Sequence, residues 1–468
     1  MDGSPEIGLG HLIRCLALAQ MLDQLFEIIF VCKKISPDFT YQVKSLSYKL
    51  VLIVDEKEFI DQLDKDDLVV LDHYGLDSSY QVKVKALGCK LICIDDVPDK
   101  IFYADLIINH APNINASTYK AQAYTLFALG LDYVLLRPVF FELANSIRVQ
   151  KKISSAFVCF GGSDSENLTI KTVEILKLDL RFRKVNIVVG SSYKEIDYLK
   201  SILVGDDRFK LYSSIGAEQI ANLILQSDLA IVPASGILQE ALILGCQVIS
   251  GMYVENQIYI YENYKKLGAF ESANNFSKES IETAINKKFE AAGASYKALI
   301  DGKSPTRLLS LFKQLAEQDK VALRDITKDD LFKTYHWATN NIIRSFSYSK
   351  HKINFEEHSA WFLQKAESKT CFYFIAAIDG NDIGSIRFDI NNNEAIISYL
   401  LDPEYHNRGL GVSLLKLGLE RLLTKNITKL KQVVGYVMPE NIASAKAFEK
   451  LGFVKEIEND NFKFVKNI

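Results

Sequence analysis

Two series of short β-branched runs constrain the fold of this chain more than any other feature of its sequence. Amphipathic or loop stretches separate the runs, which is typical of parallel strands joined by helical crossovers. The first series is IIFV (28–31), VLIV (51–54), LVVLD (68–72), LICID (91–95) and LIIN (106–109), and the second is SAFVCFGG (155–162), VNIVVG (185–190), FKLY (209–212), DLAIVP (228–233) and CQVISG (246–251). We predict two Rossmann-type units, residues 1–140 and 141–318, with a hinge at LLRPVFFE (135–142).

Residues 319–468 have a different pattern and are predicted to form a separate domain. Three strand-like segments, at 371–379, 384–390 and 395–402, are joined by the turn sequences DGND and NNNE. Turn residues of this kind between short strands indicate an antiparallel meander. The predicted fold class is therefore α/β, with two Rossmann-type units followed by an α+β domain.

Composition excludes several classes of protein. The 468 residues carry 55 basic and 58 acidic side chains, and this near-balance argues against a surface built to bind nucleic acid or anionic lipid. The sequence has no run of about 18 apolar residues, and MDGSPEIGLGH lacks the basic and apolar regions of a secretion signal. We expect a cytoplasmic chain without nucleic-acid or membrane partners, and the sequence leaves its oligomeric state open.

Cysteine and aspartate spacing gives no sign of a metal site. The seven cysteines form no CxxC pair, so we expect reduced, buried thiols. The Asp-x-Asp at 64–66 lies in a solvated charge run before a predicted strand. We therefore expect no bound metal.

A GxGH sequence opens the first predicted helix. Gly8 and Gly10 permit a tight turn, and the free N–H groups at the helix start attract anions. His11, in the first turn, can exchange a proton near neutral pH, and Arg14 adds a cation. A simple turn with a structurally satisfied histidine is the alternative interpretation.

Further polar residues directly follow predicted strands, where ligands of open α/β sheets bind. The N–H groups of Ser235 to Ile237 begin a helix and suit a diphosphate. Glu240, one turn later, is placed to hold ribose hydroxyls, although a plain surface charge is the alternative. The strand-end segments are Asp72-His73-Tyr74-Gly75, Asp95-Asp96, Gly161-Gly162-Ser163-Asp164, Ala234 to Glu240 and Asn256-Gln257.

In this order, the motifs resemble the family of UDP-2,4-diacetamido-2,4,6-trideoxy-β-L-altropyranose hydrolases of pseudaminic acid biosynthesis. The resemblance covers residues 2 to about 315 and rests on GLGHLIRCLALA, DHYGLD, IDD, LRPVF, FGGSD, SGxxxE, ENQ and DGK. It implies a GT-B architecture with UDP held by the second unit. The family's catalytic histidine falls on His11, its cleft tyrosine on Tyr74, its asparagine on Asn256 and its nucleotide-binding glutamate on Glu240. The UDP-sugar-binding candidates are Gly10, Arg14, Gly162, Ser235, Gly236, Ile237, Glu240 and Gln257.

The expected chemistry is hydrolysis at an anomeric carbon that bears UDP. UDP is a good leaving group, so activating water matters more than protonating the diphosphate. A neutral imidazole suits the first task, and helix N–H groups stabilise the departing diphosphate without a metal. We expect water to attack C1 with inversion, with His11 as the base.

Two departures from that family are visible. Its members begin with an apolar strand that ends in Arg-x-Asp before the GxGH loop, whereas this sequence starts at Met1-Asp2. We expect either an upstream start or a first sheet without the strand that positions His11. The nucleotide loop reads ASGILQE, where the family more often has a second glycine and an aromatic residue before the glutamate.

The C-terminal domain carries a second pair of motifs. RGLG (408–411) lies at a strand-to-helix junction, where backbone N–H groups and a cation suit a diphosphate. Together with NIASAKAFEKLGF (441–453), it resembles the acetyl-CoA site of GNAT N-acetyltransferases. The resemblance implies that the backbone of Arg408, Gly409, Leu410, Gly411 and Val412 grips the pyrophosphate, that Asn441 and Ser444 lie beside the pantetheine, and that the AIISYLL strand is splayed.

Catalytic groups of this domain are harder to assign. The segment 336–362 looks like the acetyltransferase of the same pathway, which implies Asn340, Tyr348 and His358 as substrate-side candidates, with a core role as the alternative for His358. We propose Glu394 as the base. The family's usual acid is a tyrosine where this chain has Phe448, so Tyr436 or solvent is expected to protonate CoA.

The two resemblances predict one bifunctional enzyme that uses acetyl-CoA as co-substrate. It would acetylate the C4 amine of a UDP-4-amino-4,6-dideoxy sugar and then hydrolyse the product to 2,4-diacetamido-2,4,6-trideoxy-L-altrose and UDP. Two alternatives stay open. The N-terminal region is either a GT-B glycosyltransferase or a non-catalytic nucleotide-sugar-binding scaffold for an active acetyltransferase.

Overall fold

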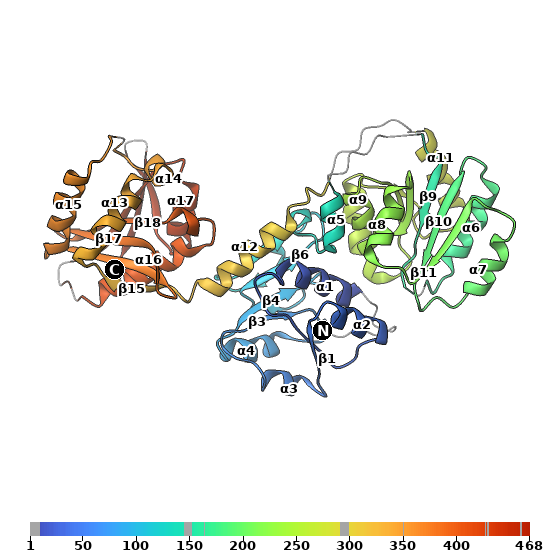
Figure 1. The fold of residues 1–468 in the computed structure, drawn as a ribbon, viewed down its shortest axis with the longest axis horizontal. Coiled ribbons are helices and arrows are strands. Elements are labelled where there is room, and N and C mark those ends of the chain that lie inside the picture. The colour runs from blue at the N-terminus through green and yellow to red at the C-terminus, as the bar shows by residue number, and fades with distance from the viewer. Residues whose placement is uncertain are drawn as a thin grey trace. The chain divides into compact units, whose positions relative to one another are not determined.

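The computed structural model describes residues 10–144, 152–162, 164–290, 299–349, 351–425, 427, 430–458 and 461–468. The chain forms two compact units, Met1–Leu309 and Ser310–Ile468. Figure 1 traces the helices and strands of each unit. Among the described helices, none is both long and apolar enough to cross a membrane.

The first lobe of the first unit is built from parallel strands that match the first series of apolar runs. Its central strands are nearly continuous β-branched runs with buried side chains, which is typical of strands covered on both faces. Side chains of Ser36, Asp55 and Asp77 cap three of its helices. The elements are α1 (Gly10–Leu22), β1 (Ile29–Cys32), α2 (Pro37–Ser45), β2 (Lys49–Leu52), α3 (Glu56–Ile60), β3 (Leu68–Leu71), α4 (Ser78–Ala86), β4 (Lys90–Ile94), β5 (Ile101–Phe102), β6 (Leu106–Asn109), β7 (Lys120–Ala121) and β8 (Leu126–Leu129).

The sheet of this lobe is divided. Strands β1 and β2 form a two-stranded sheet, and β3, β4, β6 and β8 form a four-stranded sheet in that order. In the described part of the chain, β1 pairs with β2, and β3 pairs with β4. Strand β3 leads into Asp72.

The second lobe is a six-stranded parallel sheet in the order β11-β10-β9-β12-β13-β14. This is the Rossmann strand order, in which successive strands are added first on one side of the first strand and then, from the fourth strand on, on its other side; here the change falls between β9 and β12. The loops after β9 and β12 carry the GGSD and ASGILQE motifs. The elements are β9 (Ser155–Val158), α6 (Leu168–Leu178), β10 (Lys184–Val189), α7 (Ile196–Leu203), β11 (Phe209–Ser213), α8 (Ala217–Leu225), β12 (Leu229–Pro233), α9 (Gly236–Ile243), β13 (Gln247–Gly251), α10 (Ile258–Lys266), β14 (Glu271–Ser272) and α11 (Lys278–Glu290).

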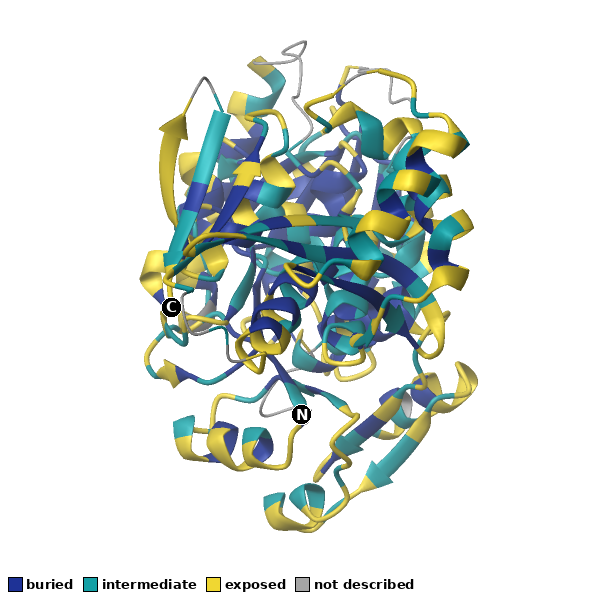
Figure 2. Cartoon of the chain, turned by 90° about the vertical axis from the view of Figure 1, so that its left-hand side faces the viewer, coloured by how far each residue is buried: buried dark blue, intermediate teal, exposed yellow. Residues whose placement is uncertain are grey.

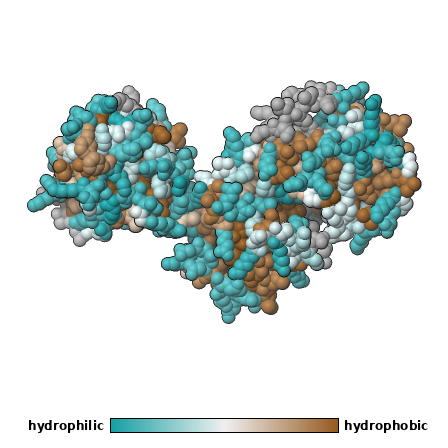
Figure 3. All heavy atoms as spheres, viewed as in Figure 1, coloured by the Kyte–Doolittle hydropathy of each residue, from teal (hydrophilic) through white to brown (hydrophobic). Residues whose placement is uncertain are grey.

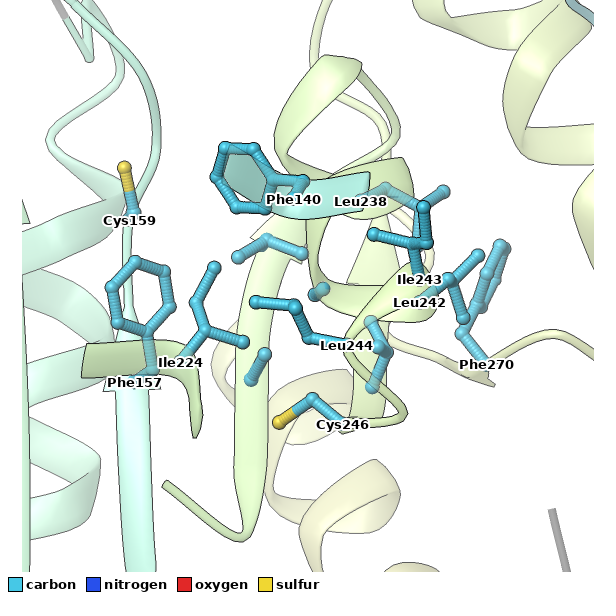
Figure 4. Packing of buried hydrophobic residues seen from close by; sticks show 14 of the residues in the cluster. Phe140, Phe157, Cys159, Ile224, Leu238, Leu242, Ile243, Leu244, Cys246 and Phe270 are labelled. Atoms are coloured by element: carbon cyan, nitrogen blue, oxygen red, sulfur yellow. The ribbon is translucent and has the colours of Figure 1, made fainter. Parts of the chain in front are cut away.

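The segment predicted as a hinge packs into this second lobe. Helix α5 (Pro138–Leu143) forms most of this segment, and Val134, Leu136 and Phe140 are almost completely buried. Figure 4 shows Phe140 in one hydrophobic cluster with Leu238 of α9 and Phe157 of β9. The connection between the lobes is thus anchored by apolar side chains.

The second unit is an α+β domain around one seven-stranded sheet, ordered β15-β16-β17-β18-β19-β21-β20. The predicted meander is present as antiparallel β16, β17 and β18. Asp379 and Gly380, both with positive φ, make the two-residue turn between β16 and β17. The elements are α12 (Ser304–Glu317, which begins in the first unit), β15 (Ala322–Asp325), α13 (Leu331–Thr339), α14 (Asn341–Ser345), α15 (Phe355–Glu367), β16 (Cys371–Ile378), β17 (Asn381–Asn391), β18 (Glu394–Leu401), α16 (Leu410–Leu423), β19 (Gln432–Val437), α17 (Ile442–Lys450), β20 (Val454–Glu458) and β21 (Asn461–Asn467).

Buried residues lie in the interiors of the sheets and on the inner faces of the helices (Figure 2). The visible surface mixes hydrophilic and hydrophobic residues on both units (Figure 3). The predicted fold class, α/β with parallel sheets and a C-terminal α+β domain, is confirmed.

Candidate active sites

A histidine, an aspartate and an arginine meet at the carboxyl end of β3. His11 lies in the first turn of α1, and its Nδ1 is 2.7 Å from Oδ1 of Asp72, the residue that follows β3. Arg14, one turn further along α1, donates to Oδ2 of Asp72 at 2.6 Å through Nε. Helix α1 is apolar on the side that carries Leu12 and Leu16, and burial of that side fixes which face meets the sheet.

The arrangement defines the tautomer of His11. Burial alone raises the pKa of Asp72, but the hydrogen bonds and charge of Arg14, aided by His11, hold it well below its ordinary value. Nδ1 of His11 lies between Oδ1 of Asp72, which can only accept, and Nη2 of Arg14 at 3.0 Å, which can only donate. We assign the proton to Nδ1 because its contact with Asp72 is the shorter one, at 2.7 Å. In the neutral ring, Nε2 is then free to accept a proton, as a general base requires.

Tyr74 joins this cluster through a second carboxylate. Its ring meets that of His11 edge-on with centroids 4.7 Å apart, and its hydroxyl donates to Asp96 at 3.1 Å. Asp96 follows β4 and accepts from Nη1 of Arg14 at 3.0 Å. The structure therefore brings together the predicted His11, Tyr74 and Arg14. Two carboxylates bind the Arg14 guanidinium, so its positive charge is largely compensated by Asp72 and Asp96 rather than by a ligand.

His110 is a residue of this site that the sequence analysis missed. It follows β6, as Asp72 follows β3, and its Nδ1 accepts the backbone N–H of Leu135 at 3.3 Å. Burial and the charge of Arg14 lower its pKa to about 4, against the opposing charges of Asp96 and Asp72. The ring is neutral at pH 7, and because Nδ1 accepts a hydrogen bond, Nε2 carries the proton. The carboxylates whose charges act on this ring are Asp96 and Asp72, which both bind Arg14. The position of His110 directly after a predicted strand, LIIN (106–109), is the signal in the sequence from which it could have been predicted.

The UDP candidates of the second lobe lie on the loops after β9, β12 and β13. Gly162 lies in the turn after β9, and its backbone leaves no room for a side chain at Gly190, whose Cβ would lie 2.5 Å from the Gly162 carbonyl oxygen. Ser235 is the N-cap of α9, followed by Gly236 and Ile237, and no side chain caps this helix start. Its N–H groups fit an anion. Gly10 is exposed at the start of α1.

Glu240 is a buried residue and not the surface charge that was considered as the alternative to a nucleotide-binding role. Its side chain is buried and accepts from Arg137 at 2.7 and 3.1 Å. Oε1 of Gln257 accepts the backbone N–H of Tyr253 at 3.0 Å. Asn256 lies in the 3-10 helix Glu255–Gln257, and its side chain is outside the described residues, as is Ser163.

The second unit contains a splayed pair of strands. Strands β18 and β19 are parallel and paired from Glu394↔Gln432 to Ile397↔Gly435. Beyond this point, β18 stays paired with β17 to Leu401, and β19 stays paired with β21 to Val437. Backbone groups between β18 and β19 are thus open beyond Ile397, as the predicted pantetheine site requires.

The RGLG loop follows β18 and starts α16. Gly409 has a φ of +69°, which favours glycine, and a Cβ there would displace the end of the Gln314 side chain, 2.2 Å away. Arg408 pairs with Glu317 at 3.3 Å and donates to the carbonyl of Glu404. The N-cap of α16, Gly409, has no side chain to cap the helix, so the N–H groups of Leu410 and Gly411 are open to a diphosphate. The N–H of Val412, also expected to bind it, instead donates to the Gly409 carbonyl at 3.3 Å.

Asn441 and Ser444 lie opposite this loop, at the start of α17. Oδ1 of Asn441 accepts the N–H of Ser444 at 3.1 Å and caps the helix. Oγ of Ser444 accepts the hydroxyl of Tyr399 at 2.9 Å. Tyr399 lies on β18 beyond the splay point, and no sequence motif singled it out.

The structure separates the remaining candidates. Glu394 lies at the end of β18 away from the splay, and its carboxylate accepts from Gln432. Tyr436 lies beyond the splay point. The pKa of Tyr348 is raised mainly by burial and also by the nearby phenol of Tyr436. These two tyrosines are therefore neighbours, whereas Glu394 does not join them.

His358 has the core role that was left open for it. It is 4% exposed, its Nε2 is 3.1 Å from the hydroxyl of Thr334, and aromatic rings surround it. Burial lowers its pKa, so the ring is neutral. The substrate-side alternative for His358 is not supported by this geometry. Asn340 caps α14 by accepting the N–H of Ile342 at 2.9 Å.

Comparison with known proteins distinguishes the two parts of the chain. Residues 320–454 match the family model of the acetyltransferase (GNAT) domain. An uncharacterized protein of Methanocaldococcus jannaschii is 28% identical over 97% of this chain and 96% of its own length. A solved domain from the same organism is 26% identical and covers 32% of this chain and 99% of its own, with a TM-score of 0.29.

Two further relatives resemble the N-terminal part. The UDP-2,4-diacetamido-2,4,6-trideoxy-β-L-altropyranose hydrolase of Campylobacter jejuni is 28% identical over 55% of this chain and 91% of its own length. The spore coat polysaccharide biosynthesis protein SpsG of Bacillus subtilis is 25% identical over 68% of this chain and 98% of its own length.

Fold and sites together define a chain that joins a Rossmann-type α/β region to an acyltransferase domain. More particularly, a region similar to the altropyranose hydrolase precedes a GNAT acetyltransferase domain. The predicted fusion is confirmed.

Proposed function

We propose that the chain catalyses two consecutive steps of nucleotide-sugar metabolism. The GNAT domain transfers the acetyl group of acetyl-CoA to the C4 amine of UDP-4-amino-4,6-dideoxy-N-acetyl-β-L-altrosamine. The N-terminal region then hydrolyses the product to UDP and 2,4-diacetamido-2,4,6-trideoxy-L-altrose. The His11–Asp72 pair, in a region similar to the altropyranose hydrolase, is the observation that carries this proposal.

In the hydrolytic step, water is the nucleophile and His11 is the base. Asp72 holds Nδ1–H, so Nε2 takes a proton as the water oxygen bonds to C1. The C1–oxygen bond breaks with its electron pair going to UDP, and the N–H groups of Gly236 and Ile237 stabilise the added charge. The N–H of Ser235 donates to the carbonyl of Pro233 at 2.8 Å and does not take part. Tyr74, held by Asp96, is placed beside His11 to orient the sugar.

In the acetyl transfer, the open N–H groups at the start of α16 hold the CoA pyrophosphate. Arg408 leaves its ion pair with Glu317 and binds the pyrophosphate instead. The unpaired edges of β18 and β19 bind the pantetheine amides. Tyr348 and Tyr436 lie on the substrate side.

The two reactions share an intermediate, because the acetylated UDP-sugar is the product of one and the substrate of the other. Covalent linkage of two sites raises their effective concentration to roughly the mM range when the linker is short. The working domain limits are residues 1–140, 141–318 and 319–468.

The test is to incubate the full-length protein with the 4-amino UDP-sugar, with and without acetyl-CoA, and to measure CoA and UDP separately. We expect stoichiometric CoA release, followed by UDP release only when acetyl-CoA is present. The matched control is His11→Asn, which should release CoA at the normal rate but no UDP.

Other outcomes would contradict parts of the proposal. CoA release without UDP would support the scaffold alternative. UDP release from the unacetylated sugar would reverse the proposed order of steps.

A further inference from the structure

The position of the usual GNAT acid is occupied by a side chain that belongs to the core. Phe448 is 2% exposed, stacks on Phe464 with centroids 5.1 Å apart, and meets Phe453 edge-on at 4.9 Å. Its Cζ lies 2.3 Å from where a Cβ on Gly435 would be. The ring therefore points at the backbone of β19. A phenyl ring has no hydroxyl, so Phe448 cannot donate a proton to the sulfur of CoA.

Tyr399 lies where β18 parts from β19, on the side of the sheet that the helices cover. Residues two apart on a strand share a face. Ile397, the last residue of β18 paired with β19, packs in one buried cluster with Leu414 of α16 and Phe448 of α17, and Tyr399 packs against the same cluster. Its phenol thus lies between the opened strand, α16 and α17.

Two contacts connect Tyr399 to both motifs of the acetyl-CoA site. Its hydroxyl donates to Oγ of Ser444 at 2.9 Å. A Cβ built on Gly411 of the RGLG loop would lie 3.6 Å from its ring and 3.8 Å from its hydroxyl oxygen. Tyr399 as a whole residue is half-buried rather than sealed in the core.

Tyr436, the donor expected from the sequence, faces the other side of the sheet. A Cβ on Gly435 would point at Phe448 of α17, so residue 435 faces the helices. Tyr436 is the next residue along β19 and faces the opposite way. Its neighbour there is Tyr348, on the side assigned to the amine substrate.

We propose that Tyr399, hydrogen-bonded to Ser444, is the general acid that protonates the sulfur of CoA. This inference rests on the acetyl transfer proposed above. The amine nitrogen bonds to the carbonyl carbon, and the carbon–sulfur bond then breaks with its electron pair going to sulfur. The Tyr399 hydroxyl gives its proton to the sulfur. The proton that the nitrogen loses on becoming an amide returns to Tyr399 through solvent, so no charge accumulates.

The environment of Tyr399 suits this role. Burial raises its pKa to about 12, so the hydroxyl stays protonated throughout the neutral range. Ser444 Oγ holds the hydroxyl in place before the thioester binds, and can pass its own proton onward when it accepts from Tyr399.

The first test compares Tyr399→Phe with wild type in single turnovers of acetyl transfer to the 4-amino UDP-sugar. We expect a rate roughly 10²-fold lower, because general acids contribute about 10²–10⁴-fold, with no change in the dissociation constant of CoA. Tyr373→Phe is the matched control, since Tyr373 is a buried tyrosine on β16 outside this site, and its rate should be normal. A normal rate for Tyr399→Phe, or an equal loss in CoA affinity, would overturn the proposal.

The second test is a crystal structure of the full chain with CoA, which does not depend on the identity of the amine. We expect the sulfur within hydrogen-bond reach of the Tyr399 hydroxyl. A sulfur turned toward Tyr436 would refute the assignment. If wild type does not acetylate the 4-amino sugar, the proposed substrate is wrong, and the CoA complex still decides the role of Tyr399.

Discussion

Nδ1 of His11 lies 2.7 Å from Oδ1 of Asp72, although 61 positions of sequence separate the two residues. Arg14, one helical turn after His11, also binds Asp72, so two residues of α1 set the start of the helix against the end of β3. The pair favours one tautomer of His11, and the contribution of this tautomer to catalysis can be measured.

Asp72→Asn is expected to abolish most UDP release while leaving acetyl transfer intact. The amide no longer supplies a charged acceptor for Nδ1–H, and an aspartate-to-asparagine change next to a catalytic histidine has cost about 10⁴-fold in another enzyme. The measurement is the rate of UDP release from the acetylated sugar, with circular dichroism to verify folding. Asp66→Asn, in an exposed charge run, is the control. Full turnover by Asp72→Asn would show that Asp72 does not orient His11.

His110 should make the first unit less stable in mild acid. Its folded pKa is about 4 and its ordinary value is 6.5, so between these values the unfolded chain binds a proton that the folded chain does not. The contribution is absent above pH 6.5 and destabilises progressively as the pH falls toward 4, by on the order of 1–3 kcal/mol.

The test for His110 is thermal unfolding of wild type and His110→Asn at pH 7.5 and 5. Asparagine keeps an acceptor for the Leu135 N–H but does not titrate. Burial raises the pKa of Asp95 to about 6, and this group has the opposite effect on stability, so only the difference between the two proteins is informative. Equal acid shifts in both would contradict the prediction.

Arg137→Met should destabilise the first unit at pH 7 and much less at pH 5. Removing one partner of a buried ion pair costs about 3–5 kcal/mol, because the other charge is left without compensation. Burial already raises the pKa of Glu240, and without Arg137 nothing opposes that rise. The folded state of the variant then binds a proton that the unfolded state does not, and its stability recovers as the pH falls. Chemical denaturation at both pH values measures the effect, and a pH-independent loss would contradict it.

Gly190→Ala should weaken UDP binding through the backbone. The new Cβ would lie 2.5–2.9 Å from backbone atoms of Gly162, so the loop after β9 must move. We expect a several-fold higher dissociation constant for UDP by calorimetry and a loss of about 1–3 kcal/mol in stability. Gly216→Ala is the matched control, because nothing lies within 4 Å of its Cβ and its φ is −76°. Unchanged UDP affinity would place the nucleotide away from this loop.

The sequence alone predicted the strands and their parallel or antiparallel type. Runs such as LVVL and LICI are continuously apolar and contain β-branched residues, and burial on both faces of a parallel sheet favours this pattern. The DGND turn predicted the hairpin after β16 because Asp379 and Gly380 adopt positive φ values. Local preferences of this kind act over a few residues, so sequence is sufficient to read them.

Partners between distant segments could not be read in this way. The sequence analysis selected Arg14 as a ligand for UDP, yet Asp72 and Asp96 bind its guanidinium. Glu394 was chosen as a base from its place at a strand start, but the splay opens at the other end of β18. His110 and Tyr399 were missed because each gains its role only from neighbours on other elements.

The sequence by itself determined the classes of element, their order and the two motif sets that identify a nucleotide-sugar region and a GNAT domain. Only the tertiary structure decided which charges are already paired, which tautomer His11 holds and which hydroxyl lies in the splay. The physical reason is range. Backbone preference and hydrophobic periodicity are set by nearby residues, whereas hydrogen bonds and pKa values depend on side chains that packing brings together from distant parts of the chain.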